Sequence, residues 1–143
     1  MTAQCMPDLP SAGDLRSDTG LRVAQHLLDR ARAEHGLSGL ALVSSDGVSL
    51  AAALPGDMTQ EDFAGLAAGM LAFSQRALQR IGGTTELHSV AIRYGAGRLY
   101  LRPLRGGELG LVILADLARD EQGLGEVASG ILAHLQRDWA TPA

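Results

Sequence analysis

The sequence predicts an α+β domain of the broad α/β class, in which a five-stranded antiparallel sheet is sandwiched between helices. The spacing of apolar residues switches between helical and strand periods and indicates the element order α-β-β-α-β-β-β-α. Short connections rich in glycine join the successive strands, and strands joined in this way run antiparallel. A chain of 143 residues is long enough to bury one proper core without disulfides or metals.

The first helix is expected after a polar N-terminal segment. Residues 1–14 contain two prolines and show no hydrophobic period, so we expect a flexible tail, followed by a single domain over residues 15–141. Gly36 supplies a left-handed stop for the helix. The apolar residues at helical spacing are Leu21, Ala24, Leu27, Leu28 and Ala31.

A hairpin and a second helix follow. Two apolar runs, residues 39–44 and 48–52, flank Asp46-Gly47, a pair that tolerates the positive φ angles of tight turns. Thr59 with Asp62 three positions later resembles a capping box and opens a helix. That helix is predicted to run to Ile81 and to stop at Gly82-Gly83.

Three strands and a last helix complete the order. Residues 87–94 alternate in polarity and are placed at a sheet edge, and they are followed by strands over 98–102 and 109–115. Residues 40–43 and 109–114 are the most uniformly apolar runs, so we place them side by side at the centre. The apolar stripe of the last helix consists of Leu124, Val127, Ala128, Ile131, Leu132, Leu135 and Trp139.

Composition argues against several classes of protein. The formal net charge is −4, whereas a nucleic-acid-binding protein usually carries a basic surface. Cys5 is the single cysteine, so no internal disulfide forms, and a reducing, cytoplasmic compartment is expected. No basic start is followed by an apolar run, so no signal peptide is predicted. The longest run of apolar residues and glycine, residues 63–73, is far shorter than the ~20 residues of a membrane span.

No motif of catalysis or cofactor binding is found. The glycine pairs end a helix or join two strands, whereas a phosphate-binding loop connects a strand to a helix. The four histidines show no spacing typical of a helical zinc site. His88 and Ser89 are neighbours on one predicted strand, so their side chains point to opposite faces. The sequence therefore predicts that the protein is not an enzyme and holds no metal and no cofactor.

The middle helix is apolar on every side between Phe63 and Phe73. A helix that packs on a sheet needs one apolar stripe, and one that is apolar all round is expected to be covered all round. Four residues are predicted to face the sheet: Phe63, Leu66, Met70 and Ala77. Four small residues form a smooth strip elsewhere on the helix: Gly65, Ala68, Gly69 and Ala72. We interpret this strip as the contact surface for a second protein chain, the alternative being a third layer of the same chain.

The ordered motifs resemble the roadblock (dynein light chain) family of the roadblock/longin group, including its bacterial GTPase-regulator members. The resemblance rests on residues 37–51 with their Ser-x-Asp-Gly turn, on the small-residue helix over 68–80, and on the strand at 109–116. It implies a five-stranded sheet with one helix on one face and two on the other. It also implies homodimers formed by the second helix and third strand, which bind small Ras-like GTPases. The family has no catalytic motif to carry over.

The resemblance and the residues together predict a homodimeric scaffold that binds, and regulates, a small Ras-like GTPase. In the dimer the smooth strip faces its copy, and the strand from Ser89 to Ala91 pairs antiparallel with its mate. Four polar residues of the same helix are the candidates for partner binding: Gln75, Arg76, Gln79 and Arg80. Their other interpretation is a solvated face. The alternative function, a ligand sensor of the PAS or profilin-like kind, requires an interior pocket with converging polar groups.

Overall fold

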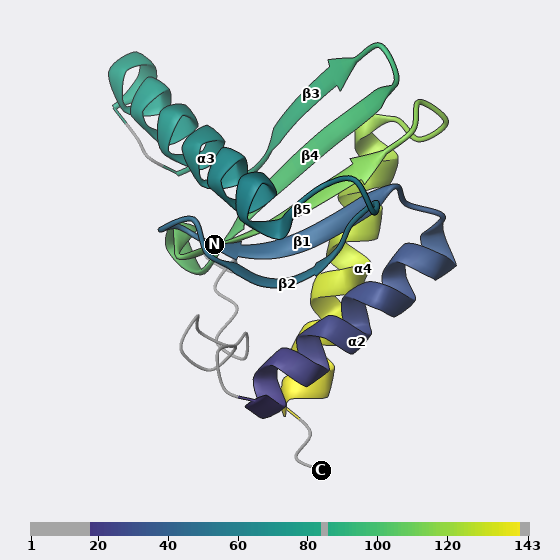
Figure 1. Cartoon of the computed structure of the whole chain (residues 1–143). Helices are drawn as coiled ribbons and strands as arrows, with labels where there is room; N and C mark the ends of the chain where they lie inside the picture. Colours follow the sequence, from purple (N-terminus) through teal and green to yellow (C-terminus); the bar gives the residue numbers. More distant parts are fainter. Residues whose placement is uncertain (1–17, 84–85, 141–143) are drawn as a thin grey trace.

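The structure is a computed structural model that describes residues 18–83 and 86–140, so the predicted tail over 1–14 lies outside the described residues. Figure 1 shows the chain passing through helices and strands in the predicted order. The elements are α2 (Asp18–His35), β1 (Gly39–Ser44), β2 (Ser49–Ala53), α3 (Gln60–Gly82), β3 (Val90–Tyr94), β4 (Gly97–Leu104), β5 (Leu109–Ala115) and α4 (Glu121–Ala140), with a 3-10 turn over Arg105–Gly107.

The five strands form one antiparallel sheet in the order β2-β1-β5-β4-β3. The central strand is β5, and β1 pairs with it in a continuous register that sets Leu40 opposite Ile113. Every residue of β1 and β5 is buried, as expected for strands that are covered on both faces. The predictions of the fold class, the central pair and the edge position of β3 are confirmed.

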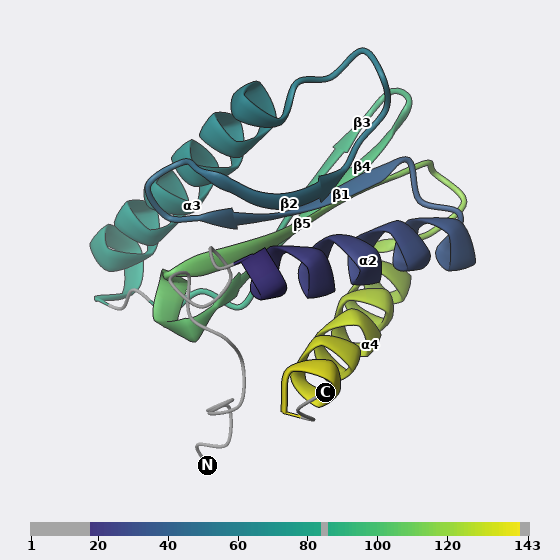
Figure 2. The ribbon, with the colours of Figure 1, turned by 60° about the horizontal axis from the view of Figure 1, so that its bottom comes forward.

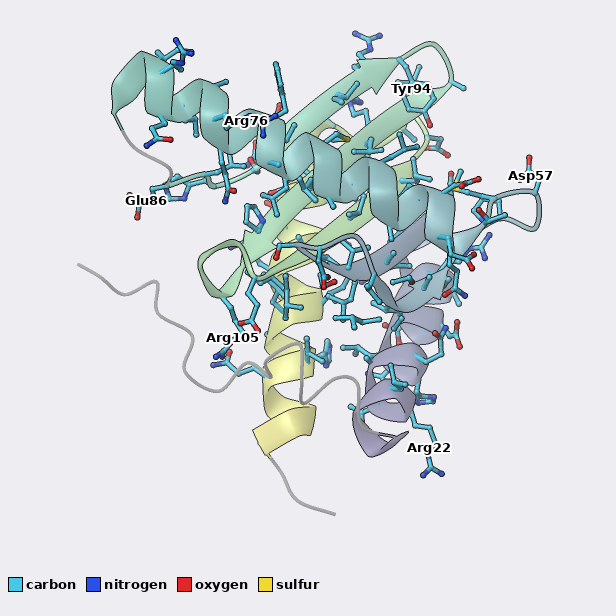
Figure 3. All side chains as sticks on the ribbon, turned by 60° about the vertical axis from the view of Figure 1, so that its left-hand side comes forward. Arg22, Asp57, Arg76, Glu86, Tyr94 and Arg105 are labelled. Carbon is cyan, nitrogen blue, oxygen red and sulfur yellow. The ribbon has the colours of Figure 1, made fainter. Side chains whose placement is uncertain are left out.

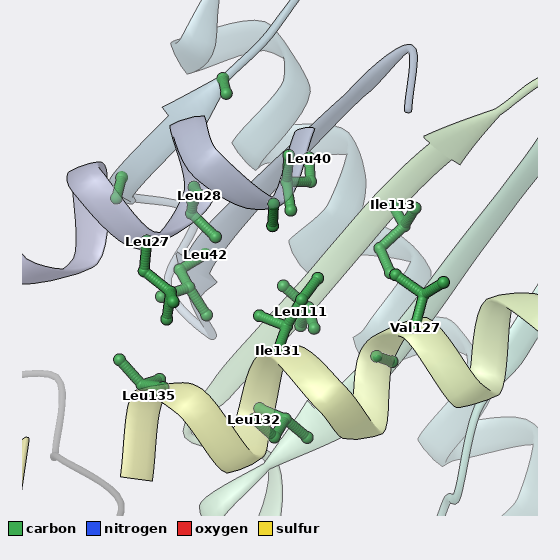
Figure 4. Close-up of a cluster of buried hydrophobic side chains, with 14 of the residues drawn as sticks. Leu27, Leu28, Leu40, Leu42, Leu111, Ile113, Val127, Ile131, Leu132 and Leu135 are labelled. Carbon is green, nitrogen blue, oxygen red and sulfur yellow. The ribbon is translucent and has the colours of Figure 1, made fainter. Parts of the chain in front are cut away.

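The helices lie on both faces of the sheet, α2 and α4 on one and α3 on the other (Figure 2). Between the sheet and the α2–α4 pair lies the larger hydrophobic cluster, in which leucines of both helices meet Leu42 and Leu111 (Figure 4). The smaller cluster lies under α3 and includes Val43, Val112 and Phe63. The predicted stripe of α4 is buried from Leu124 to Leu135, and the side chain of Trp139 lies outside the described residues.

The strand β3 is shorter than predicted, because it begins at Val90 and not at Leu87. Val90 lies opposite Leu101, so the next hydrogen-bonded pair along the ladder would join residue 88 to Pro103. Proline has no N–H to donate, and the pairing stops there. Ser89 therefore precedes the strand, and only Ala91 of the two residues predicted to pair with a second copy belongs to it.

The prediction that Leu66 faces the sheet is wrong, because its side chain is 69% exposed. The buried residues of α3 are Phe63, Ala64, Ala67 and Leu71. The two alanines let the helix axis approach the sheet closely, and the buried stripe is centred on them. Leu66 is one position from Ala67, about 100° around the helix, and lies outside this stripe.

Both ends of α3 are fixed by hydrogen bonds. The Thr59 hydroxyl accepts a hydrogen bond of 3.2 Å from the Asp62 N–H, which is the N-cap half of the predicted capping box. At the other end Gly83 adopts a left-handed conformation, with φ 69°, and donates its N–H to the Gln79 carbonyl. The helix that carries the candidate surface is thus held at both termini by local chemistry.

We predict that Thr59→Ala lowers the free energy of unfolding by about 1 kcal/mol, because it removes the acceptor for the Asp62 N–H. Urea titrations at one fixed protein concentration measure the change, since self-association would add a concentration-dependent part. Thr59→Ser keeps the hydroxyl and should retain most of the stability. An equal loss in both variants would contradict the assignment of Thr59 as the helix cap.

Candidate protein-interaction surface

One flank of α3 is covered by turns of the same chain. Ala68 and Gln75 are seven positions apart and share this flank. A Cβ added to Gly47 would lie 3.9 Å from the Cβ of Ala68, and one added to Gly107 would lie 2.7 Å from Nε2 of Gln75. Both glycines have positive φ angles, 89° and 100°, which other residues rarely adopt. The β1–β2 and β4–β5 turns therefore pass close beside this flank.

The opposite flank of α3 exposes large apolar side chains. Leu66 and Phe73, also seven positions apart, are 69% and 67% exposed. Ile92 and Tyr94 of β3 are 43% and 46% exposed. They share the α3 face of the sheet, because Ile92 lies opposite Leu99, which packs against the cluster under α3. We call these four residues, Leu66, Phe73, Ile92 and Tyr94, the α3–β3 surface.

Figure 1 shows the arrangement behind this surface: α3 and β3 diverge from the middle of the sheet. Where two neighbouring elements diverge, the apolar side chains that face the space between them remain exposed. Exposed large apolar residues that gather on one face are typical of a protein-binding surface, whereas single scattered ones are ordinary. The sequence signal that could have identified Leu66 and Phe73 was their common spacing of two helical turns.

The predicted smooth strip is only partly open. Gly65, Gly69 and Ala72 are exposed, and a Cβ added at either glycine would contact nothing within 4 Å. Ala68 is half-buried because it lies against the β1–β2 turn. Gly69 is the member of the strip that follows most directly from the flank of Leu66 and Phe73 around the helix, so close approach of another helix is sterically open there.

In the part of the chain that the structure describes, no strand pairs with the outer edge of β3. Tyr94 lies opposite Gly97 across a two-residue turn, so alternate residues of β3 pair with β4. Ala91 and Arg93 fall between these pairs, and their N–H and C=O groups point away from the sheet. Both residues are exposed. The structure therefore brings an open strand edge next to the apolar side chains of the α3–β3 surface.

The candidate partner-binding residues occupy the C-terminal half of α3 and lie in different surroundings. Arg76, Gln79 and Arg80 are exposed, whereas Gln75 is half-buried beside Gly107. Figure 3 labels Arg76 on α3 and Tyr94 at the far end of β3. Arg76 and Arg80 are four positions apart and share one face. Neither forms an ion pair within the described part of the chain.

A second surface feature lies on the other face of the sheet, where α4 passes β4 and the residues that precede β3. It is an open groove of about 890 Å³ whose lining includes His88, Arg102, Glu121 and Glu126. The guanidinium of Arg102 donates a hydrogen bond of 2.8 Å to the Ser129 hydroxyl across it. Within residues 18–83 and 86–140, no group of three or more potential ligands could hold a metal ion. Over the same ranges, no helix combines the length and apolar character needed to cross a lipid bilayer.

One protein-family model matches this chain. The model of the Roadblock/LC7 domain matches residues 23–115. A search of curated protein sequences found no match.

Solved structures with a similar fold include the following three. Myxococcus xanthus MglB aligns over 89% of this chain and 97% of its own, with a TM-score of 0.73 and 16% identity. The gliding protein MglB from Thermus thermophilus aligns over 82% and 88%, with a TM-score of 0.69 and 21% identity. A Roadblock/LC7 domain from Streptomyces avermitilis aligns over 82% and 98%, with a TM-score of 0.68 and 20% identity. At these identities the similarity concerns the fold.

Proposed function

Because the chain belongs to the Roadblock/LC7 family, we propose that it is a homodimeric interaction module that binds and regulates a small Ras-like GTPase. Domains of this family are regulatory and non-catalytic. The observation that carries the proposal is the α3–β3 surface, where four exposed apolar side chains adjoin an open strand edge. Exposed apolar surfaces of this kind are typical of protein-binding sites.

A second copy of the chain fits this surface. In a two-fold dimer, Ala91 and Arg93 of β3 would pair antiparallel with the same strand of the partner and extend the sheet across the axis. The partner's α3 would then lie beside α3, where Gly69 permits close approach and the side chains of Leu66 and Phe73 become buried. One of the structurally similar proteins is described as MglB with a tetrameric arrangement, which supports self-association as a property of this fold.

The GTPase would bind the face of the dimer formed by the two α3 helices. Arg76 and Arg80 point from the exposed half of that helix, and arginine is enriched at protein interfaces. We propose that Gln79 adjoins them at the rim, whereas Gln75 is partly used inside the chain beside Gly107. Any acceleration of GTP hydrolysis would come from ordering the GTPase's own loops, a positioning effect that needs no covalent catalyst from this protein.

The alternative, a small-ligand sensor, is supported less well. A sensor site is a pocket that encloses most of its ligand. Two hollows of the described residues are open to solvent, one beside α4 and one between the β1–β2 turn and the start of α3. Small and aliphatic side chains together with Phe63 fill the space between α3 and the sheet. The space that a sensor uses for its ligand is occupied here by core.

We predict that Gly69→Arg converts a dimer into a monomer, because it forces a long charged side chain between two closely packed α3 helices. Phe73→Glu should act in the same direction by placing a charge on the apolar flank. Light scattering coupled to size-exclusion chromatography at micromolar concentration measures the mass of each variant.

Gly130→Arg is the matched control for the dimer variants. Gly130 is an exposed glycine of α4, and a Cβ there would also contact nothing within 4 Å. The same substitution on the other face of the sheet should leave the dimer intact. A monomeric wild type, or a Gly69→Arg variant that remains dimeric, would contradict the proposed arrangement.

We predict that the double variant Arg76→Glu, Arg80→Glu binds the GTPase at least about tenfold more weakly than the wild type does, equivalent to about 1.4 kcal/mol. The partner is a Ras-like GTPase purified after capture on the dimer, and calorimetry compares its GTP-analogue and GDP forms. The wild type should prefer one nucleotide form, because the switch loops of such GTPases change with the nucleotide.

The control for this experiment is Arg22→Glu, Arg30→Glu, which makes the same change of charge at exposed positions of α2. It should bind with wild-type affinity. Equal affinities for the α3 double variant and the wild type would exclude this surface. Absence of binding in both nucleotide forms would exclude that GTPase as the partner.

A further inference from the structure

The two edges of the sheet differ in how their backbone groups are used. The edge strand β3 is exposed along its length except at the half-buried Val90. The other edge strand, β2, is buried from Leu50 to Ala53. An unpaired edge strand is a template for another strand, and proteins block the edges that they do not use for assembly. The structure shows how β2 is blocked.

A side chain of α2 forms the hydrogen bonds that another strand would make to β2. The Gln25 amide donates from Nε2 to the Ala52 carbonyl at 2.7 Å, and its Oε1 accepts from the Ala52 N–H at 3.2 Å. This two-way exchange is the pattern of a hydrogen-bonded residue pair in an antiparallel ladder. Asp29, one turn later on α2, accepts a further bond of 3.0 Å from the same Nε2 and fixes the orientation of the amide.

A second side chain of α2 occupies the next outward position. Arg32 donates from its guanidinium to the Leu54 carbonyl at 3.3 Å. Ala52 and Leu54 are two residues apart, which is the repeat of outward-pointing groups on a strand. Gln25 and Arg32 are seven residues apart, so both side chains leave the same face of α2. Two successive outward positions beside β2 are therefore used by one helix.

We propose that Gln25 and Arg32 block strand addition at β2 and so restrict pairing between copies of this chain to β3. The inference rests on the proposed dimer, in which β3 is the shared strand. If β2 were open as well, each dimer would carry two further edges, and dimers would join β2 to β2 into a growing sheet. With β2 blocked, assembly through strands stops at the dimer.

The first test measures whether Gln25 protects the backbone N–H of Ala52 in β2. Gln25→Ala removes both bonds to Ala52 and keeps a strong helix former on α2. Amide hydrogen exchange should show the Ala52 N–H protected in the wild type and at least about tenfold less protected in the variant. Asp29→Ala is the matched control: it removes only the bond between Gln25 and Asp29, so most of the protection should remain. Unchanged protection in Gln25→Ala would overturn the proposal.

The second test measures assembly. We expect Gln25→Ala, Arg32→Ala to form species larger than a dimer whose mass rises with concentration in sedimentation experiments, with the secondary structure retained by circular dichroism. Adding Ala91→Pro removes an outward N–H from β3 and should limit the assembly to no more than two chains. A double variant that keeps the wild-type mass at all concentrations would overturn the proposal.

The two tests separate this proposal from the proposed function. A monomeric wild type contradicts the dimer through β3, whereas the block at β2 is still judged by the exchange of the Ala52 N–H. In that case the double variant should associate through β2 alone, and Ala91→Pro should not change the mass of the species formed. If the double variant still associates without a limit in size after Ala91→Pro is added, pairing through β2 is contradicted.

Discussion

The strand β5 is buried on both faces, and the rest of the architecture depends on covering it. Five strands spaced about 4.8 Å apart make a sheet roughly 20 Å wide, whereas one helix with its side chains is about 10 Å across. Two helices, α2 and α4, cover one face of the sheet. On the other face α3 is alone and packs on β1, β2 and β5 more than on β4. Ile92 and Tyr94 of β3 consequently remain exposed on that face, and this incomplete cover is the physical basis of the proposed dimer.

The sequence predicts the order of elements and the centre of the sheet because these depend on local patterns. Leu40 and Leu111 lie in uniformly apolar runs, Asp46-Gly47 is a turn pair, and Thr59 precedes its helix as a cap. The rotation of α3 about its own axis, which decides the residues that face the sheet, is not set by local sequence patterns. It depends on which residues pack against the sheet: Ala64 and Ala67 are buried there, and Leu66 lies outward, against expectation.

Local sequence patterns also do not predict the residue at which β3 begins or the hydrogen bonds of Gln25 to β2. Pro103 limits β3 only once the register with Leu101 is known, because the missing N–H then falls on the side of β3. Gln25 appears in the sequence as a polar residue on the outer side of an amphipathic helix. Its partner Ala52 is 27 residues away, so no spacing rule within α2 connects them. The apolar composition of α3 predicted a contact surface on this helix, which stays a prediction, and the structure identified Leu66 and Phe73 as its large exposed side chains.

The asymmetry of the two sheet edges connects the fold to the proposed partner. A two-fold dimer through β3 places both α3 helices on one side of a continuous sheet, with α2 and α4 on the other. Arg76 and Arg80 of both copies then lie on the same side, and a GTPase placed across the axis could contact arginines from two chains at once. Growth through β2 would repeat this face along a filament and multiply the sites. Gln25 and Arg32 of α2 bind the outward groups of Ala52 and Leu54. In the proposed assembly, the helix that covers the opposite side of the sheet would thereby also limit the number of GTPase-binding faces.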